Sequence, residues 1–439
     1  MEKALPVPSS LTAAAPDPSA VLIRMREQGY GFLLNLLFLV WMLYSVTQFR
    51  LPTSPIVLSD ADASPLLRQV IFTACGMAAF ARMFLFGTIG AIVALRLPIL
   101  GLAGLLFFSI LWSIQPVVTT KRSIIFLFGL LMLVMTVHGS KTPARSFLGT
   151  VFWFTVFVAA VSLLFHFVLP KDCTVNPGRP GLAGISNHPN TLAPILSIGL
   201  LLSLGLKGDS PESRFRGFCG RIVIAIALIM TTSITTIMTT LAGLGIFMLL
   251  NSSDYRRGMI QLFVFTVTLL VLIIGVDQLR SAFFSATGRD EYLSGRDELW
   301  RVVTLEIMES PVVGNGFGAF WTEGKGRELV QTWNPRQSHN AYLDVMLDLG
   351  VIGLLVVLLL FPVAQLIAWK KQAGIPGTAQ RRAMAAMLSV SLCYMVFYSM
   401  AQSFYLRFDS YPFLILTWIT LVMVNPDKNQ ITNEFQSKA

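Results

Sequence analysis

The sequence predicts an all-α integral membrane protein with about twelve transmembrane helices. Of its 439 residues, 54% are hydrophobic and only 13% are charged, whereas soluble domains carry about 25% charged residues. The apolar runs are about 17–25 residues long, which is the length a helix needs to cross about 30 Å of hydrocarbon. They also lack the alternating pattern of a transmembrane β-barrel.

The apolar runs divide the chain into five regions. Residues 1–30 are polar and contain no signal-peptide core, so they predict a disordered cytoplasmic arm before an uncleaved anchor. Helices one to nine occupy 31–276, a periplasmic loop with an amphipathic helix occupies 277–341, helices ten to twelve occupy 342–425, and a cytoplasmic tail occupies 426–439. The predicted spans are about 31–49, 66–86, 97–114, 122–138, 147–169, 190–206, 221–234, 236–250, 258–276, 342–369, 384–402 and 411–425.

Lys and Arg in the short loops predict which membrane face is cytoplasmic. One set of loops, which includes Arg82 and Arg214, carries 19 basic residues, and the opposite set carries 7. The richer set should be cytoplasmic, which places both termini inside and the long loop outside. The net charge of +10 thus reflects placement in membrane loops, and we expect no nucleic-acid partner.

The long loop contains a predicted helix over 296–309, with Ser294 as its candidate N-cap. One face of this helix is apolar, as in a helix lying at the membrane interface; it is formed by Leu299, Trp300, Val303 and Ile307. The following GNGFG, residues 314–318, resembles a phosphate loop, but no Lys-Ser/Thr follows it. It instead predicts a tight turn that lets Phe317, Phe320 and Trp321 dip into the interface.

SHNAYLDVMLDLGVIG, residues 338–353, opens the tenth predicted membrane helix. Ser338 or Asn340 is the candidate cap, and His339 lies in the first turn at the outer surface. A histidine at a helix end is usually a cap or a satisfied polar residue, and catalysis is the alternative. Asp344 and Asp348 share a helix face. Carboxylates near hydrocarbon tend to face a cavity or partner, although these two can also pair with loop arginines above the headgroups.

Two further basic clusters are predicted on the outer side. In NPGRPGLAGISNHPNTLAP, residues 176–194, Pro189 suits a first helical turn, and Arg179 and His188 stand beside it. This is an anion site by geometry, or else an ordered loop with a capped helix. Arg122, next to Lys121, opposes the charge rule. It indicates either an outer anionic ligand or a side chain that snorkels to phospholipid phosphates.

The remaining polar residues predict no further chemistry. His138 and His166 are isolated and are expected to be packing or interface residues. The sequence contains no HExxH, Walker or GxSxG motif. The cysteines lack CxxC spacing, so we expect no disulfide framework and no metal site; they are Cys75, Cys173, Cys219 and Cys393.

The order of these motifs resembles the O-antigen ligase and polysaccharide polymerase superfamily of bacterial inner-membrane proteins. The similarity covers about 97–360, through WSIQPVVTTKR, GLAGISNHPNTLA, SGRDELW, ESPVVGNGFGAFW and SHNAYLDVMLDLGVIG. The loop is especially similar to exopolysaccharide polymerases of the ExoQ type. The resemblance implies a twelve-helix enzyme of the inner membrane that uses an undecaprenyl-diphosphate-linked glycan at the periplasmic face, without cofactor or metal.

The resemblance also implies roles for individual residues. His339 matches the loop histidine that acts as base or orienter for the acceptor hydroxyl, and Arg296 matches the loop arginine of the GRxxxW element. Arg179 lies where a family arginine meets the diphosphate. One position departs from the family, because Ser233 is followed by Ile234 instead of a basic residue. Another cation must then bind the diphosphate, with Arg289, Arg296 and Arg122 as candidates and Asp344 as a further substrate contact.

The leading functional hypothesis is therefore polymerisation of lipid-linked repeat units into exopolysaccharide. The expected partners are the glycan donor and acceptor, membrane lipids, and a copolymerase that regulates chain length. Within the same class, an O-antigen ligase or a protein O-oligosaccharyltransferase is the alternative. A twelve-helix secondary transporter is the alternative of another class. It fits less well, because the connection after the sixth helix, 207–221, is short and the titratable residues cluster at the outer loop.

Overall fold

The computed structural model describes residues 18–47, 65–86, 97–138, 140, 142–176, 179–252, 296–321, 325–330, 335–375 and 378–424. The predicted ninth span, 258–276, and the predicted C-terminal tail, 426–439, lie outside these residues. The other predicted spans overlap helices, but the helix expected over 221–234 runs from Pro211 to Met230 and takes up most of the predicted connection 207–221. Six helices of the described part are long and apolar enough to cross a membrane, so the protein is a many-span helical membrane protein.

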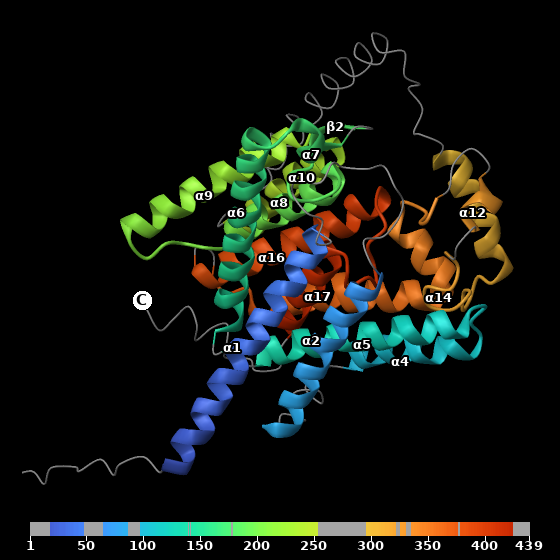
Figure 1. Ribbon diagram of the computed structural model, residues 1–439, viewed down its shortest axis with the longest axis horizontal. Helices are drawn as coiled ribbons and strands as arrows, with labels where there is room; N and C mark the ends of the chain where they lie inside the picture. The colour runs from blue at the N-terminus through green and yellow to red at the C-terminus, as the bar shows by residue number, and fades with distance from the viewer. Residues whose placement is uncertain are drawn as a thin grey trace, which may run out of the picture.

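The helices form a bundle that is longest in the horizontal direction of Figure 1. The first half of the bundle consists of α1 (Pro18–Thr47), α2 (Pro65–Leu85), α4 (Leu97–Phe108), α5 (Pro116–His138), α6 (Pro143–Val168), α7 (Lys171–Thr174), α8 (Pro189–Ser203), α9 (Pro211–Met230) and α10 (Ile234–Asn251). After the undescribed segment follow α12 (Arg296–Glu309), α13 (Lys325–Leu329), α14 (Ala341–Leu358), α15 (Ala364–Gln372), α16 (Ala379–Val396) and α17 (Tyr411–Val424).

α1 begins earlier than expected. It starts at Pro18, inside the segment 1–30 that the sequence predicts as a disordered arm. Proline is favoured in a first helical turn, and the Arg-Met-Arg-Glu-Gln stretch over 24–28 consists of good helix formers. The first membrane helix therefore extends into this polar stretch, which the hydropathy pattern does not indicate.

α16 and α17 occupy the centre of the bundle (Figure 1). Every residue of α17 is buried, and it packs against α5, α8, α15 and α16. α16 presents small buried residues to its neighbours, among them Ala383, Ala386 and Ser389. Small side chains let membrane helices approach closely. The core therefore lies where these two helices meet the surrounding ones.

The long apolar run that starts at Ala341 is not one regular helix. Gly350 interrupts α14 with φ 61° and ψ −162°. Further along, Leu359–Val363 form a π-helical turn that contains Pro362 and leads into α15. Turns of this kind occur where the α-helical hydrogen-bond ladder is interrupted, as it is at a proline.

A short hairpin precedes α8. Its strands β1 (Val175–Asn176) and β2 (Arg179–Leu182) are antiparallel, with Val175 opposite Leu182. Gly181 lies in β2 with φ 142°, and a Cβ there would be 2.3 Å from the carbonyl oxygen of Thr231. The hairpin therefore packs closely on the turn between α9 and α10.

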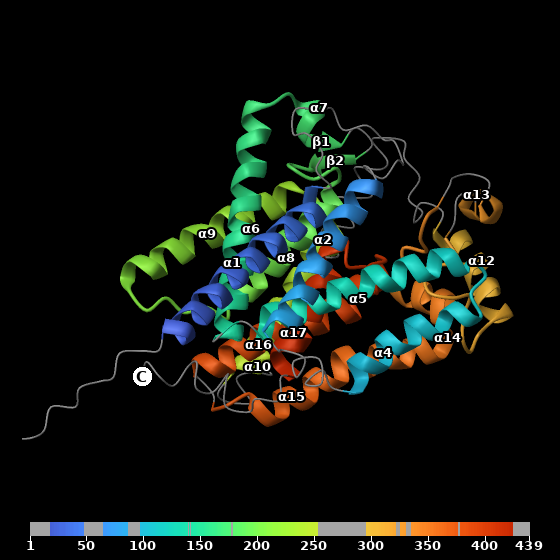
Figure 2. The same ribbon diagram turned by 60° about the horizontal axis from the view of Figure 1, so that its bottom comes forward.

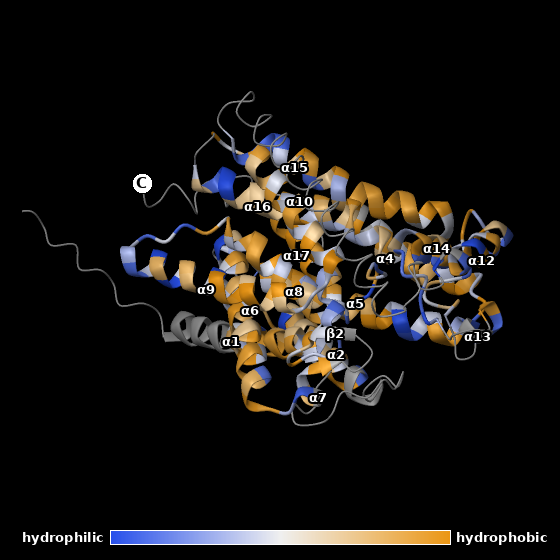
Figure 3. Ribbon diagram, turned by 90° about the horizontal axis from the view of Figure 1, so that it is seen from above, coloured by the Kyte–Doolittle hydropathy of each residue, from blue (hydrophilic) through white to orange (hydrophobic). Residues whose placement is uncertain are grey.

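Hydrophilic residues gather at the two ends of the longest axis (Figure 3). They surround the start of α9 and the α15–α16 connection at one end, and α12 with α13 at the other. Between them the helices are mostly hydrophobic. α12 lies beside the beginning of α14, where the chain also turns from α4 into α5 (Figures 1 and 2).

Candidate functional site

His339 lies in a strained loop directly before α14. Its φ is 56°, a left-handed conformation that is uncommon for a residue other than glycine. The peptide N–H of Ser338 donates to Asp344 Oδ1 at 3.0 Å, and the carbonyl of Ser338 accepts from Trp300 Nε1 at 2.8 Å. Strain of this kind persists only where surrounding contacts fix it, and these two hydrogen bonds supply that restraint.

The residues after His339 fix the start of α14. Asn340 is the N-cap, and its Oδ1 accepts from the backbone N–H groups of Tyr342 and Leu343 at 3.0 and 3.3 Å. Ser338 Oγ donates to the Asn340 carbonyl at 2.7 Å. Of the two predicted cap candidates, Asn340 is the cap and Ser338 supports it.

Asp344 connects the His339 loop to a second tryptophan. Its Oδ1 accepts from Trp321 Nε1 at 2.9 Å as well as from Ser338 N. Trp300 lies on α12 and Trp321 follows the GNGFG turn. One carboxylate oxygen of α14 thus holds both the segment after the GNGFG turn and the loop before α14. Asp344 therefore orders the loop that carries His339.

Four polar side chains define the surroundings of the His339 imidazole. Partial burial and the positive charge of Arg296 lower the pKa of His339 to about 4; a hydrogen bond with Gln402 opposes this shift, and His188 adds to it. Gln337 Nε2 lies 3.4 Å from His339 Nδ1. His339 is therefore neutral at pH 7 and can accept a proton.

Arg296 is the first residue of α12. Its Nη1 donates to the carbonyl of Ala401 at 3.2 Å, in the segment that follows η3 (Tyr398–Met400). This hydrogen bond fixes the beginning of α12 near the end of α16. The predicted pair of His339 and Arg296 is thus close enough in space to interact electrostatically.

His188 is the N-cap of α8, and its Nδ1 accepts from Asn190 N at 3.0 Å. Thr191 N donates to the His188 carbonyl at 3.0 Å, and Pro189 has no N–H to offer. The first amides of α8 are thus engaged within the chain. The capped-helix interpretation is confirmed, and an anion site built from free N–H groups of this helix is wrong.

The α8 start also contacts the α9–α10 turn. Ser233 Oγ donates to Asn190 Oδ1 at 3.0 Å. Ser233 is the residue that the resemblance expects before a basic side chain, and Ile234, which follows it, is exposed. The backbone of Arg179 lies in β2, beside the same turn, whereas Arg289 lies outside the described residues.

Arg122 belongs to a different group of charges. It lies on α5, and its side chain passes over Gly318, where a Cβ would be 2.3 Å from Arg122 Cδ. The charges that act on Asp348 are those of Arg122, Asp344 and Arg407. Asp348 Oδ1 is buried without a hydrogen-bond partner. The sequence indicates either an outer anionic ligand or a phospholipid phosphate as the partner of Arg122. In the structure, its side chain lies against the GNGFG turn.

The GNGFG segment is a turn that docks into the break of α14. Asn315 N donates to the Leu347 carbonyl at 2.8 Å, and Gly316 N donates to the Asp348 carbonyl at 2.9 Å. The turn interpretation is confirmed. Phe317 and Phe320 are 5% and 1% exposed, so the expectation that they dip into the membrane interface is wrong: they fill the protein core.

The predicted helix of the long loop is confirmed as α12, but its apolar face has another role. This face packs with α14 and the residues after the GNGFG turn to form a second hydrophobic cluster, rather than lying on the membrane. Packing against α14 holds Trp300 and Arg296 in place. The cluster consists of Leu299, Val303, Ile307, Phe320, Val330 and Leu347.

Sequence reasoning missed several residues that shape the site. Gln402 and Ala401 follow α16 and carry no motif. The sequence pattern predicts Trp300 only as part of an apolar face, whereas in the structure its indole N–H donates to the Ser338 carbonyl. A tryptophan near a predicted polar site is a usable signal, because a buried indole N–H requires an acceptor.

Residues 220–358 of this many-span helical membrane protein match the model of a family described as O-antigen ligase. That range includes Arg296 and His339. The chain is also similar to the exopolysaccharide production protein ExoQ of Rhizobium meliloti (strain 1021). The two are 25% identical over 276 residues, which is 56% of this chain and 59% of the relative. The predicted resemblance is confirmed over these ranges, and the chain spans less than two thirds of the length of this relative.

Proposed function

We propose that this protein polymerises undecaprenyl-diphosphate-linked oligosaccharide units into exopolysaccharide at the periplasmic face of a bacterial inner membrane. One observation carries the proposal: a neutral His339 is held in a strained loop beside Arg296, within the region that matches the O-antigen ligase family. The similarity to an exopolysaccharide production protein supports polymerisation within that family. The family match also favours glycosyl transfer over the transporter alternative.

The reaction needs a base and a cation, and the site offers both. The acceptor hydroxyl oxygen attacks the anomeric carbon of the donor, and its proton passes to His339. The bond from that carbon to the phosphate oxygen breaks, and the electron pair leaves with the lipid diphosphate. Arg296 stabilises the growing negative charge without titrating. Direct attack inverts the anomeric centre.

Donor binding provides the base strength that the free site lacks. A histidine whose pKa is about 4 is a weak base at neutral pH. A diphosphate bound at Arg296 brings negative charge that offsets the arginine and raises the pKa of His339 toward the optimum for proton transfer. In this account His339 becomes an effective base only when donor is present.

The proposal also covers the membrane orientation and further contacts to the diphosphate. The proposal includes twelve spans with both termini cytoplasmic, so that the His339 loop faces the periplasm next to the flipped lipid-linked donor. Arg179 and Arg289 are proposed as further diphosphate contacts. No metal or cofactor is part of the proposed step, because the donor bond is already activated.

Cells that express variants in place of the natural protein test the proposal. His339→Ala should abolish high-molecular-weight polymer while the protein remains in the membrane. His138→Ala is the matched control, because His138 is exposed at the end of α5, away from the start of this helix where Arg122 lies. This variant should leave the polymer unchanged. Full-length polymer from His339→Ala would contradict the role.

A second readout separates the two glycan-transfer alternatives. Deletion of a polymerase leaves single repeat units, whereas deletion of an O-antigen ligase leaves long chains that are not attached to an acceptor. We predict single units.

A further inference from the structure

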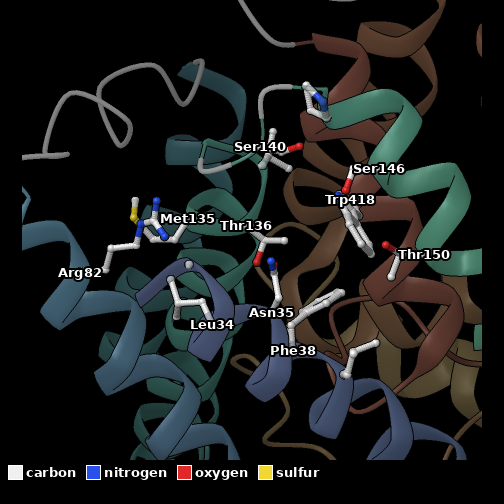
Figure 4. A pocket seen from close by; sticks show the side chains of 14 residues that line it. Leu34, Asn35, Phe38, Arg82, Met135, Thr136, Ser140, Ser146, Thr150 and Trp418 are labelled. Carbon is white, nitrogen blue, oxygen red and sulfur yellow. The ribbon is translucent and has the colours of Figure 1, made fainter. Parts of the chain in front are cut away.

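A pocket lies at the other end of the bundle from His339. Its volume is about 370 Å³, within the range of about 300–1,000 Å³ that is typical of ligand pockets. α1, α2, α5, α6 and α17 form its walls (Figure 4). The pocket adjoins the end of α5 and the start of α6. Arg122 and the loop that carries His339 lie instead toward the start of α5. This end of α2 and α5 is the one that the basic-residue distribution predicts to be cytoplasmic.

The lining of this pocket is cationic and rich in hydrogen-bonding groups. Arg82 points into it from α2 (Figure 4), and Arg82 Nη1 approaches α1 so closely that a Cβ on Gly31 would lie 3.4 Å away. No carboxylate is among the described residues that line it. Its polar side chains are Asn35, Thr136, Ser140, Ser146 and Thr150.

The position of these polar groups is informative. Asn35, Thr136 and Thr150 lie within helices that are apolar enough to cross a membrane. Polar side chains in such helices are costly against hydrocarbon and tend to face a cavity, water or a partner. A cavity that collects an arginine, an amide and several hydroxyls therefore suits a ligand with an anionic, hydrogen-bonding group.

The rest of the pocket and its surroundings are apolar. Leu34, Phe38 and Trp418 complete the wall. Beside the pocket, α1 exposes Phe32 and Leu36, which are 72% and 48% exposed, and the adjacent end of α2 exposes Phe84, at 59%. Exposed apolar side chains on membrane helices are surfaces for acyl chains. The ligand should thus combine a polar head with hydrocarbon tails.

We propose that this pocket binds the phosphate ester of an anionic phospholipid from the leaflet predicted to be cytoplasmic. Arg82 binds the phosphate through charge-assisted hydrogen bonds, and Asn35 with the hydroxyl side chains binds the glycerol head group. The tails lie along the exposed faces of α1 and α2. The cytoplasmic leaflet is rich in anionic lipid, which matches a cationic pocket at this surface.

Lipid binding to the purified full-length protein tests this site. The delipidated protein in a neutral detergent is titrated with phosphatidylglycerol or phosphatidylcholine, and bound lipid is counted by native mass spectrometry. We expect preferential retention of phosphatidylglycerol, and Arg82→Gln should weaken it about tenfold, as expected for loss of a charged hydrogen bond. Arg214→Gln removes the same charge from an exposed position of α9 and should change nothing.

Further variants and ligands keep the outcome decisive. Asn35→Leu conserves the net charge and should also weaken retention, which covers the case that Arg82→Gln does not fold. Inorganic phosphate at matched concentration should not compete; full competition would assign the pocket to a free phosphate compound and overturn the lipid assignment. Equal retention by Arg82→Gln, Asn35→Leu and Arg214→Gln would overturn the site itself.

Discussion

The catalytic role proposed for His339 depends on how the chain holds this single side chain. The two peptide groups around Ser338 bond to Asp344 and Trp300, and the imidazole then lies near Arg296 and His188. A displacement of about 1 Å at a catalytic group can cost about a hundredfold in rate. Asp344 and Trp300, which hydrogen-bond to the backbone of Ser338, should therefore affect activity without touching the substrate.

Asp344 is expected to act as a positioning residue. Asp344→Ala leaves the Ser338 N–H and the Trp321 indole N–H without their acceptor, which should lower stability by about 1–3 kcal/mol and the transfer rate by about tenfold or more. Asp344→Asn keeps an acceptor oxygen and should restore most of the rate. Initial rates in proteoliposomes measure this. Equal loss in both variants would show that the carboxylate charge matters instead.

The pKa of His339 predicts an unusual pH profile. Because this pKa is lowered to about 4 in the free protein, the acid limb of kcat/KM should fall near pH 4 rather than near the usual value of about 6.5. Arg296→Gln removes a charge that lowers the pKa, so the limb should move to higher pH. A limb near 6.5 in the natural protein would contradict the described environment.

At the scale of elements, the GNGFG turn and the break in α14 form one structure. Val351 N donates to the Pro311 carbonyl at 2.9 Å, across the point where Gly350 leaves the helical conformation. The break thus exchanges helical hydrogen bonds for bonds to the turn. α12 and the His339 loop are held against the membrane helices through this exchange.

Gly350→Ala tests the importance of the break. A Cβ at Gly350 would lie 2.3 Å from the backbone of Val312, and the residue has φ 61°, so both space and conformation oppose a side chain. We expect destabilisation of about 1–3 kcal/mol, measured by thermal unfolding in detergent. Gly149→Ala is the control, because nothing lies within 4 Å of its Cβ position. Unchanged melting of both variants would contradict the role of the break.

Elements were more predictable than their connections. Apolar runs identified the helices of the described part because burial in hydrocarbon leaves a strong, local signal. The same signal hid the break at Gly350, since glycine sits there within a continuous apolar run. The face of α12 also could not be assigned, because an apolar stripe packs equally well on lipid or on α14.

The site was predicted only in part for a related reason. His339 and Arg296 followed from a family resemblance, whereas the contact of Arg296 with Ala401 joins residues 105 positions apart. No local pattern encodes such contacts. Asp344 illustrates the same limit: the sequence showed a costly carboxylate, but its partners Trp321 and Ser338 become visible only in the fold.

In the proposed orientation, the two polar ends of the molecule face opposite sides of the membrane (Figure 3). A variant without native cysteines that carries a single Arg336→Cys change should react with a membrane-impermeant maleimide added to the periplasmic side. Arg214→Cys should react only after the membrane is opened. Both positions are exposed, so access to the side chain does not limit labelling. The reverse pattern would invert the orientation.

The central claim is that this chain alone joins lipid-linked glycans by means of His339. Purified protein reconstituted in proteoliposomes, supplied with an undecaprenyl-diphosphate-linked repeat unit and no nucleotide or added metal, tests it directly by the size of the glycan product. We expect chains of several units with the natural protein and with His138→Ala, and single units with His339→Ala. Chain growth with His339→Ala at the natural rate would contradict it.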